Sequence, residues 1–268
     1  MKRAPAAAKI NLALVVGPPR GDGRHELVSV YQRVALCDRL TVERAPDIRV
    51  EGFDADTLVR SALEAVADGT GFRAQIAKRI PVAAGLGGGS SDAATALRLG
   101  NALRDEPLSE AELHDVAREL GADIPFFLVD GPQLGMSDGT ELSPLELPQD
   151  YWVLLVLPKD ASKSSTSDVF AAFDGREGDR GYAQRRAALL AALEKVRRPR
   201  DLAALPPNDL SSSPLTDELR TLGAFRADVT GAGPVAYGLF LHGEQARVAQ
   251  RRMAALGRTW LTAPAWYR

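Results

Sequence analysis

The sequence predicts an α+β protein in which helices pack against sheets. Apolar runs typical of strands alternate with segments of helical periodicity along the whole chain. Hydrophobic residues make up 45% of the 268 positions, which is ample for buried cores. A glycine-rich loop joins one predicted strand directly to a predicted helix. A chain of this length forms one large or two medium domains.

Besides the helix that follows the glycine loop, the first half contains predicted strands, a turn-rich loop and two further helices. Alternating or apolar segments predict strands at 8–16, 26–36, 39–44 and 72–80, with a loop rich in glycine and proline at 17–23. The 3.6-residue periodicity of 54–68 predicts a helix. Ser109 and Glu112 match a capping box, so a second helix begins there and ends at Gly121.

The second half repeats this alternation after a compositional change near 146–152, which is a plausible domain boundary. Strands are predicted at 151–157, 224–229, 235–241 and at the C-terminus. Helices are predicted at 168–174, 182–197, 214–222 and 243–255, separated by a Ser/Thr-rich loop at 161–168, a charged loop at 175–181 and a glycine loop at 230–234.

The loop at residues 81–91 has the composition of a phosphate-binding turn. Its glycines Gly85, Gly87, Gly88 and Gly89 permit positive φ angles and close backbone approach, so N–H groups can converge on an anion. The following helix aims its unpaired N–H groups at the same point, and Ser90 or Ser91 can cap it. The simpler interpretation is an ordinary turn with a serine cap. The loop matches neither a P-loop nor a Rossmann turn.

Charge and amino-acid composition indicate which kind of ligand the protein binds and where in the cell it is expected. A net charge of −2 and a pI near 6 argue against a nucleic-acid-binding surface, so a small-molecule partner is expected. No apolar run is long enough for a membrane span and no signal peptide is recognisable, so we expect a cytoplasmic protein without a membrane partner. Cys37 is the only cysteine, and the few histidines are scattered, so no disulfide or histidine metal cluster is expected.

Several segments together resemble one enzyme superfamily. The loop Pro81, Val82, Ala83, Ala84, Gly85, Leu86, Gly87, Gly88, Gly89, Ser90, Ser91 resembles the ATP-binding motif of the GHMP small-molecule kinases, which include galactokinase, homoserine kinase and mevalonate kinase. Residues 230–234 resemble the third glycine motif of that superfamily. The segments 8–12, 22–27, 121–125 and 208–210 are similar to the members that phosphorylate a cytidine diphosphate-linked methylerythritol.

The resemblance implies a two-domain GHMP kinase fold and a reaction. Residues 1–149 would form an N-terminal ATP-binding and catalytic domain of the ribosomal protein S5 type, and 150–268 a ferredoxin-like, substrate-binding domain. The implied reaction is ATP-dependent phosphorylation of the tertiary 2-hydroxyl of 4-diphosphocytidyl-2-C-methyl-D-erythritol, in the non-mevalonate route to isoprenoids. Magnesium would bridge the ATP phosphates, with Ser90 as a ligand.

The resemblance also assigns roles to two residues outside the loop. Asp123 matches the general base for the substrate hydroxyl, and Lys9 matches the lysine that pairs with it. Phosphoryl transfer through a loose transition state needs alignment and charge neutralisation, which such a pair supplies. Taken alone, Asp123 is equally compatible with a turn or cap aspartate, and Lys9 with a strand lysine that extends to solvent.

The remaining matches concern the acceptor substrate. By the resemblance, Asn11 lies beside the hydroxyl or phosphates, His25 contacts the cytosine, Thr166 a phosphate, and Phe170 stacks on the base. Gly231 and Gly233 would complete the substrate-binding set. Structural roles remain open for three of them: a buried amide for Asn11, a helix N-cap for Thr166 and a core position for Phe170.

Two departures from the family pattern affect this site. Arg24 stands where the family usually has a tyrosine that stacks on the cytosine, although a planar guanidinium can also stack on a base. Thr230, Ala232 and Pro234 stand where serines are common. The alternatives are a GHMP kinase for another small alcohol, such as homoserine or a mevalonate derivative, or a non-catalytic nucleotide-binding sensor. Oligomeric state is not predicted.

Overall fold

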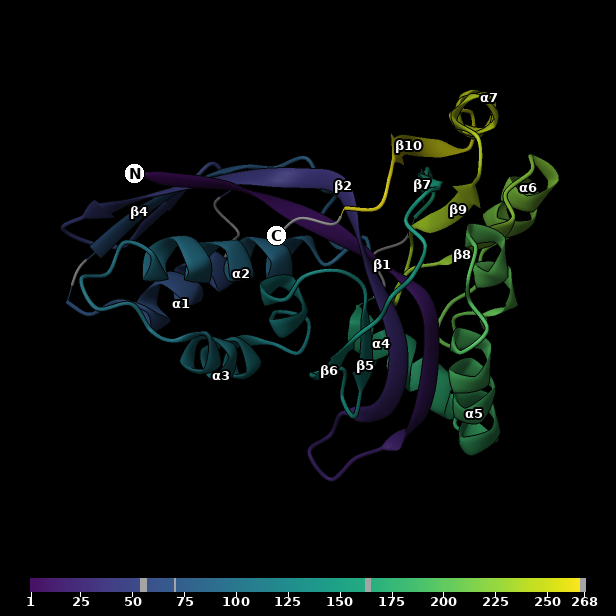
Figure 1. Ribbon diagram of the computed structural model, residues 1–268, viewed down its shortest axis with the longest axis horizontal. Coiled ribbons are helices and arrows are strands. Elements are labelled where there is room, and N and C mark those ends of the chain that lie inside the picture. Colours follow the sequence, from purple (N-terminus) through teal and green to yellow (C-terminus); the bar gives the residue numbers. More distant parts are fainter. Residues whose placement is uncertain (54–56, 70, 162–164, 266–268) are drawn as a thin grey trace.

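Two β-sheets lie side by side in the structure, each covered by helices (Figure 1). The computed structural model describes residues 1–53, 57–69, 71–161 and 165–265. The start of the helix predicted at 54–68 and part of the loop predicted at 161–168 lie outside these residues. Among the described residues, no helix is long and apolar enough to cross a membrane.

The first sheet is organised around one long hairpin. Its strands are β1 (Lys2–Pro19), β2 (His25–Ala45), β3 (Arg49–Glu51), β4 (Gly71–Ala77), β5 (Gln133–Met136) and β6 (Glu141–Pro144). Their order is β3-β4-β2-β5-β6, with β1 paired to β2. The predicted strands 26–36 and 39–44 are in fact one strand. Their apparent break is a bulge, because Ala7 pairs with Cys37 while the next residue, Ala8, pairs with Val34.

Three helices cover one face of this sheet (Figure 1). They are α1 (Thr57–Ala65), α2 (Gly88–Asn101) and α3 (Glu110–Leu120), followed by the 3₁₀ helix η1 (Pro125–Leu128). The buried residues of α2 are mostly small, among them Ala93, Ala94 and Ala96, which lets the helix approach the sheet closely. The predicted capping box of Ser109 and Glu112 is confirmed at the start of α3.

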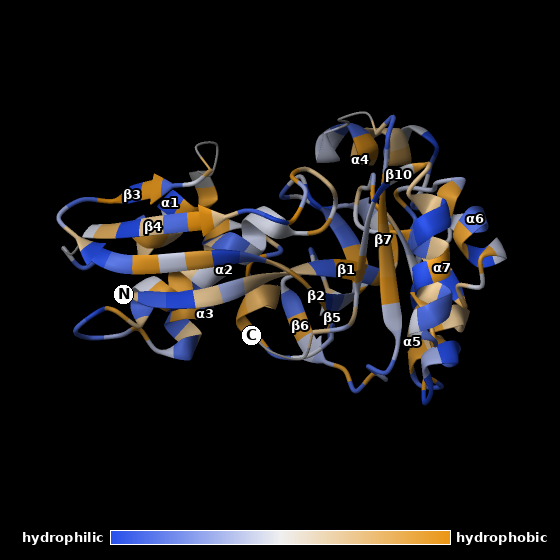
Figure 2. Cartoon of the chain, turned by 90° about the horizontal axis from the view of Figure 1, so that it is seen from above, coloured by the Kyte–Doolittle hydropathy of each residue, from blue (hydrophilic) through white to orange (hydrophobic). Residues whose placement is uncertain are grey.

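The second sheet contains β7 (Trp152–Pro158), β8 (Arg226–Val229), β9 (Ala236–Phe240) and β10 (Gly257–Thr262). Its order, β10-β7-β9-β8, is antiparallel throughout and is the order of a ferredoxin-like sheet. The associated helices are α4 (Thr166–Gly175), α5 (Tyr182–Leu193), η2 (Pro199–Ala204), α6 (Leu215–Thr221) and α7 (Gly243–Met253). In Figure 2, β7 is mostly orange, because it is a buried apolar strand. Helix α7 is mostly blue, because it buries only Ala246, Ala249 and Met253 and exposes its polar face.

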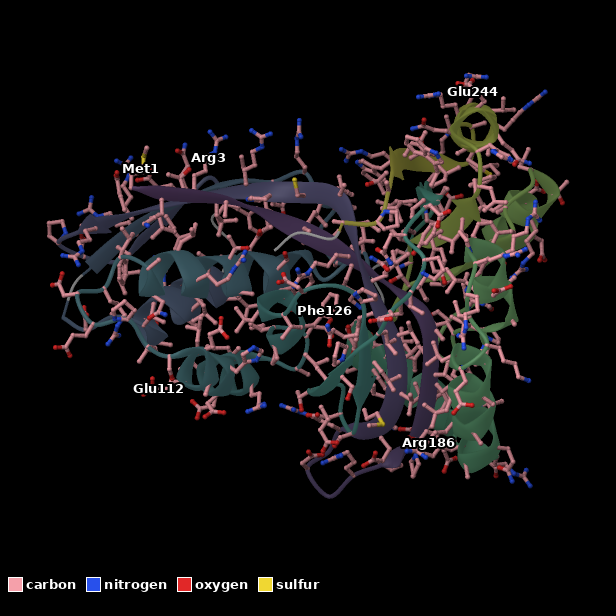
Figure 3. The ribbon with its side chains drawn as sticks, in the orientation of Figure 1. Met1, Arg3, Glu112, Phe126, Arg186 and Glu244 are labelled. Atoms are coloured by element: carbon pink, nitrogen blue, oxygen red, sulfur yellow. The ribbon has the colours of Figure 1, made fainter. Side chains whose placement is uncertain are left out.

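A shared hydrophobic core joins the two halves. Ile10 and Leu12 of β1 pack in one buried cluster with Val153, Leu155 and Tyr237 of the second sheet. The chain also returns to the first sheet after β10, since Ala35 N–H donates to the Ala263 carbonyl. We propose 149/150 as the domain boundary, which lies between β6 and β7. In Figure 3, Phe126 lies in the middle of the molecule and Glu112, Arg186 and Glu244 at its periphery.

Candidate active site

A cavity of about 800 Å³ lies where the two halves meet. Both halves contribute to its wall. Lys9, Asn11, Ala83, Gly85, Gly87 and Asp123 come from the first half, and Thr166, Phe170, Gly231 and Gly233 from the second. Arg24 and His25, at the turn end of the β1–β2 hairpin, line it as well. The structure therefore brings the predicted catalytic pair, part of the glycine loop and all of the predicted substrate residues around one space.

The glycine loop contains three residues with left-handed backbone conformations, Ala83, Gly85 and Gly87. Gly87, with a φ of 66°, is the N-cap of α2, and the helix begins at Gly88 without a side-chain cap. The proposed capping by Ser90 or Ser91 is therefore wrong, because the left-handed glycine starts the helix before the serines are reached. A Cβ on Gly87 would lie 2.9 Å from Cγ of Lys9. The bare backbone here lets the loop lie directly against Lys9.

Only part of the predicted loop faces the cavity. Ala83, Gly85 and Gly87 line it, and the first N–H groups of α2 follow directly. Ser90 lies in the first turn of α2 and is partly buried. Ser91 is buried and lines a separate, very small cavity together with Arg33. The other predicted loop residues, Pro81, Val82, Ala84, Leu86, Gly88 and Gly89, do not line the large cavity.

A buried ion cluster supports the loop from beneath. The Lys78 ammonium lies 2.6 Å from Asp38 and 2.7 Å from Asp92, and both carboxylates are fully buried. Asp38 also accepts hydrogen bonds from the backbone N–H groups of Arg79 and Ile80. Because Asp38 is on β2 and Asp92 on α2, the cluster fixes the start of α2 against the sheet. The sequence analysis did not identify it, since no motif signals charged partners so far apart in the chain.

Lys9 connects Asn11 and Asp123. Its Nζ donates to Oδ1 of Asn11 at 2.7 Å and lies 3.6 Å from Oδ2 of Asp123. The Lys9 side chain is 6% exposed, whereas that of Asp123 is 36% exposed. Asn11 Nδ2 in turn donates to the Ser29 hydroxyl at 2.7 Å. Asp123 is therefore the member of this group that a ligand in the cavity can reach, with a buried cation beside it.

The segment that carries Asp123 is held in place by Arg33. Asp123 lies in the turn between Gly121, which ends α3, and η1. The Arg33 guanidinium donates to the Phe126 carbonyl at 2.9 Å and to the Val129 carbonyl at the end of η1. Arg33 pairs with Lys9 across the β1–β2 ladder. Two neighbouring strands therefore hold this segment. Lys9 of β1 contacts it at Asp123, and Arg33 of β2 contacts it at Phe126 and Val129.

Tyr31 forms part of the wall behind Lys9. The Lys9 Nζ lies 5.7 Å from the centroid of its ring, within the range of a cation–π interaction. Burial raises the pKa of the Tyr31 hydroxyl well above its usual value, and the negative charge of Asp123 adds to the effect. Tyr31 therefore stays neutral and presents a polar, uncharged surface to the cavity.

The 208–210 motif is a structural connection next to the cavity. Asn208 Nδ2 donates to the carbonyls of Val229 and Gly231, at 2.9 and 2.7 Å, and so fixes the glycine loop at 230–234. The Asp209 carboxylate accepts from Val16 N–H at 2.9 Å and from Arg185 Nε at 3.0 Å. Of the three residues, only Leu210 lines the cavity.

Aromatic and acidic side chains form the end of the cavity opposite the glycine loop. The rings of His25 and Phe170 lie 4.8 Å apart between centroids, at an interplanar angle of 32°. His25 Nε2 lies 2.8 Å from Oδ1 of Asp174 on α4. Thr166 is the first residue of α4, and the helix is capped by Ser165 rather than by Thr166. Phe170 packs on a small apolar cluster but also faces the cavity.

Arg24 lies at the rim of the cavity and makes an ion pair there. Its guanidinium donates to the Asp138 carboxylate, which also accepts from the Thr140 hydroxyl at 2.6 Å. Burial tends to raise the pKa of Asp138, but the hydrogen bonds from Thr140 and Arg24 outweigh it and lower the pKa. Whether Arg24 stacks on a base stays a prediction. Asp138 is a site residue that the sequence analysis missed, because it lies in an unremarkable turn.

The lowered pKa of Asp138 predicts a pH-dependent contribution to stability. Charged Asp138 stabilises the fold above the pKa it has in the unfolded chain, and this contribution is lost as the pH falls through its lower folded value. We expect Asp138→Asn to reduce the free energy of unfolding by about 1 kcal/mol between pH 5 and pH 8, and the difference to shrink below about pH 4. Urea unfolding of both proteins across this range measures it. A difference that grows toward acid pH would contradict the assignment.

The fit of a magnesium ion can be judged from the oxygen ligands present. Among the residues that the structure describes, no group of three or more His, Cys, Asp or Glu side chains could hold a metal ion. Asp38 and Asp92 are already paired with Lys78. Magnesium commonly keeps several waters and binds through substrate phosphates with one or two protein oxygens. A magnesium ion at this site would therefore be carried by the nucleotide, and Ser90, the proposed ligand, does not line the cavity.

Comparison with known proteins agrees with this fold. The family described as GHMP kinases N terminal domain matches residues 57–131. A 4-diphosphocytidyl-2-C-methyl-D-erythritol kinase from Pelobacter propionicus is 34% identical over 97% of this chain and 96% of its own length. One from Moorella thermoacetica is 36% identical over 93% of both. The crystal structure of a 4-(cytidine 5'-diphospho)-2C-methyl-D-erythritol kinase superposes with a TM-score of 0.79 at 30% identity, covering 98% of this chain and 99% of that one.

The fold is that of a GHMP kinase, as the resemblance implied, and the two-domain α+β prediction is confirmed. Within that superfamily the chain belongs to the 4-diphosphocytidyl-2-C-methyl-D-erythritol kinase family. It is an ATP-dependent small-molecule kinase, a phosphotransferase with an alcohol group as acceptor.

Proposed function

We propose that this enzyme transfers the γ-phosphoryl group of ATP to the 2-hydroxyl of 4-diphosphocytidyl-2-C-methyl-D-erythritol, in the non-mevalonate route to isoprenoid precursors. The observation that carries the proposal is one cavity with two chemically different ends. A glycine loop and a Lys–Asp pair lie at one end, and an aromatic pair with an acidic neighbour lies at the other. The first suits phosphoryl transfer and the second suits a nucleobase. The names of the relatives support the same substrate.

Asp123 is the proposed general base. Its half-accessible carboxylate accepts the proton of the substrate hydroxyl as the oxygen attacks phosphorus. The Lys9 ammonium, 3.6 Å away, neutralises charge on the reacting oxygens and keeps the carboxylate oriented. Asn11 holds the ammonium at 2.7 Å, so the cation cannot drift away from the reacting groups. In this proposal Asn11 acts mainly through Lys9.

The glycine loop is the proposed phosphate cradle for ATP. The backbone of Ala83, Gly85 and Gly87 lines the cavity, and α2 begins directly after Gly87, so the positive end of the helix lies beside the proposed phosphate position. Magnesium, when carried by ATP, neutralises phosphate charge in the transition state. The Lys78 cluster supports this by holding the start of α2 rigid.

The acceptor end supports a cytidine rather than a small aliphatic alcohol. The tilted pair of His25 and Phe170 offers a flat aromatic surface on which a base can stack. Asp174 holds the imidazole through Nε2 and adds a carboxylate that can accept from an exocyclic amino group. Thr166 and the backbone of Gly231 and Gly233 line the space between the two ends, where a diphosphate would lie. Homoserine and mevalonate would leave the aromatic surface unused.

A kinetic comparison of three acceptors tests the proposal. We expect the cytidine substrate to be phosphorylated with a kcat/KM at least about 10³-fold above that for homoserine or mevalonate, because only the cytidine fills the aromatic end.

Phe170→Ala should raise KM for the cytidine substrate about tenfold, since base stacking contributes about 1–3 kcal/mol, and should leave KM for ATP nearly unchanged. His242→Ala, remote from the cavity, is the control. Equal rates on homoserine or mevalonate would overturn the assignment.

A further inference from the structure

Thr230 is a fully buried threonine in the glycine loop of the second half. Its position belongs to a glycine motif in which hydroxyl groups suggest contacts with a ligand. The residue is 0% exposed, however, so its hydroxyl cannot reach a phosphate in the cavity. Its neighbours Gly231, Ala232 and Gly233 line the cavity instead. The hydroxyl must therefore act on the protein itself.

The Thr230 hydroxyl joins three segments that are far apart in the sequence. It accepts a hydrogen bond from the backbone N–H of Asn11 at 3.1 Å. Its own proton points between two acceptors, Oδ1 of Asn11 and the carbonyl of Gly85, each 3.2 Å away. One side chain of the second half thus holds both β1 and the glycine loop of the first half.

Asn11 carries this connection on to the reacting groups. Its Oδ1 accepts from Thr230 and also from the Lys9 Nζ, at 2.7 Å, and Lys9 lies beside Asp123. The Asn11 amide is further fixed by Ser29. The order of contacts is therefore Thr230, Asn11, Lys9 and Asp123. The Gly85 carbonyl, held by the same hydroxyl, belongs to the proposed ATP cradle.

We propose that Thr230 is a positioning residue for phosphoryl transfer, which sets the Lys9–Asp123 pair and the glycine loop in one fixed geometry through Asn11 and the Gly85 carbonyl. The proposal rests on the proposed function of that site. A buried hydroxyl suits this role, because removing a buried hydrogen-bond partner is costly, and small errors in alignment cost large factors in rate. The second half of the chain thus contributes to the geometry of the catalytic groups as well as to substrate binding.

Two substitutions separate the hydroxyl from the shape of the side chain. Thr230→Val keeps the volume and removes the hydrogen bonds, and Thr230→Ser keeps the hydroxyl. We expect the valine variant to lower kcat about tenfold with both KM values changed less than about threefold, because alignment rather than binding is lost. The serine variant should retain at least about half of kcat. Thr262→Val, a buried threonine on β10 away from the cavity, should leave kcat unchanged. Thr230→Ala replaces the valine variant if that protein does not fold.

A double-mutant cycle with Asn11→Ala tests the route of action. Because Thr230 also bonds the Gly85 carbonyl, Thr230→Val should still lower kcat in the Asn11→Ala background, but by a clearly smaller factor than in the wild type. Full multiplication of the two effects, or a serine variant as slow as the valine variant, would overturn the proposal. So would a valine variant with normal kcat.

The same cycle run on thermal unfolding needs no substrate. Thr230→Val should lower the melting temperature by about 2–4 °C, and by clearly less when Asn11 is already alanine. Additive shifts would overturn the contact between the two side chains. If the wild-type enzyme does not phosphorylate the cytidine compound, the proposed function fails, and the thermal cycle still decides whether Thr230 holds Asn11.

Discussion

Asp123→Asn is expected to lower kcat by a factor of about 10²–10⁴ and to leave both KM values within about threefold. Asparagine has nearly the same shape as aspartate, but its amide cannot accept the hydroxyl proton. The loss therefore falls on the chemical step. Steady-state rates with saturating ATP and the cytidine substrate measure it.

A matched control for this variant is available on the neighbouring helix. Asp115 on α3 is 70% exposed and forms a surface ion pair with Arg118, so Asp115→Asn should keep the wild-type rate. The melting temperature of Asp123→Asn should also stay close to that of the wild type, since the Lys9–Asp123 distance of 3.6 Å is long for a strong ion pair. A variant that folds normally and keeps its rate would remove Asp123 from the mechanism.

Gly85→Ala is expected to disrupt the glycine loop more than an alanine at any other glycine of the loop. The added Cβ would lie 2.3 Å from the backbone carbonyl oxygen of Thr230, and the φ of Gly85 is +75°, which side chains rarely adopt. Neither backbone can move freely, because Thr230 is fully buried. We expect a loss of about 2–4 kcal/mol in unfolding free energy and at least a tenfold higher KM for ATP.

Gly21→Ala is the comparison for that prediction. Gly21 has no atom within 4 Å of the site of an added Cβ and has no positive φ. Its substitution should change the unfolding free energy by less than about 0.5 kcal/mol. Urea unfolding and ATP kinetics of the two variants give the answer together. If Gly85→Ala were as harmless as Gly21→Ala, the close approach of the two glycine loops would be wrong.

Much of the fold follows from local sequence patterns. The capping box at Ser109 fixed the start of α3, and the alternation of 151–157 located β7. The short strands β3, β5 and β6 were missed because three or four residues are too few to show a period. The bulge in the β1–β2 pair resembles a strand boundary in the sequence, since the extra residues Ala35 and Leu36 interrupt the alternation in the same way as a turn.

The candidate site was predictable only where residues form motifs. The glycine loop, Lys9 and Asp123 belong to recognisable segments, and the structure brings them together. Tyr31, Asp138 and Asp174 carry no motif of their own, and their place at the cavity depends on pairing between distant elements. The serines at 90–91 were misjudged as caps because a left-handed glycine can begin a helix without one.

The position of the transferred phosphate tests the central claim most directly. The enzyme is incubated with ATP and 4-diphosphocytidyl-2-C-methyl-D-erythritol, and the product is examined by ³¹P NMR with and without proton decoupling. The 2-hydroxyl is on a carbon without hydrogen, so we predict a new phosphomonoester signal that shows no three-bond coupling to a proton. A signal split by protons, which places the phosphate on a primary or secondary hydroxyl, or no new signal at all, would contradict the account.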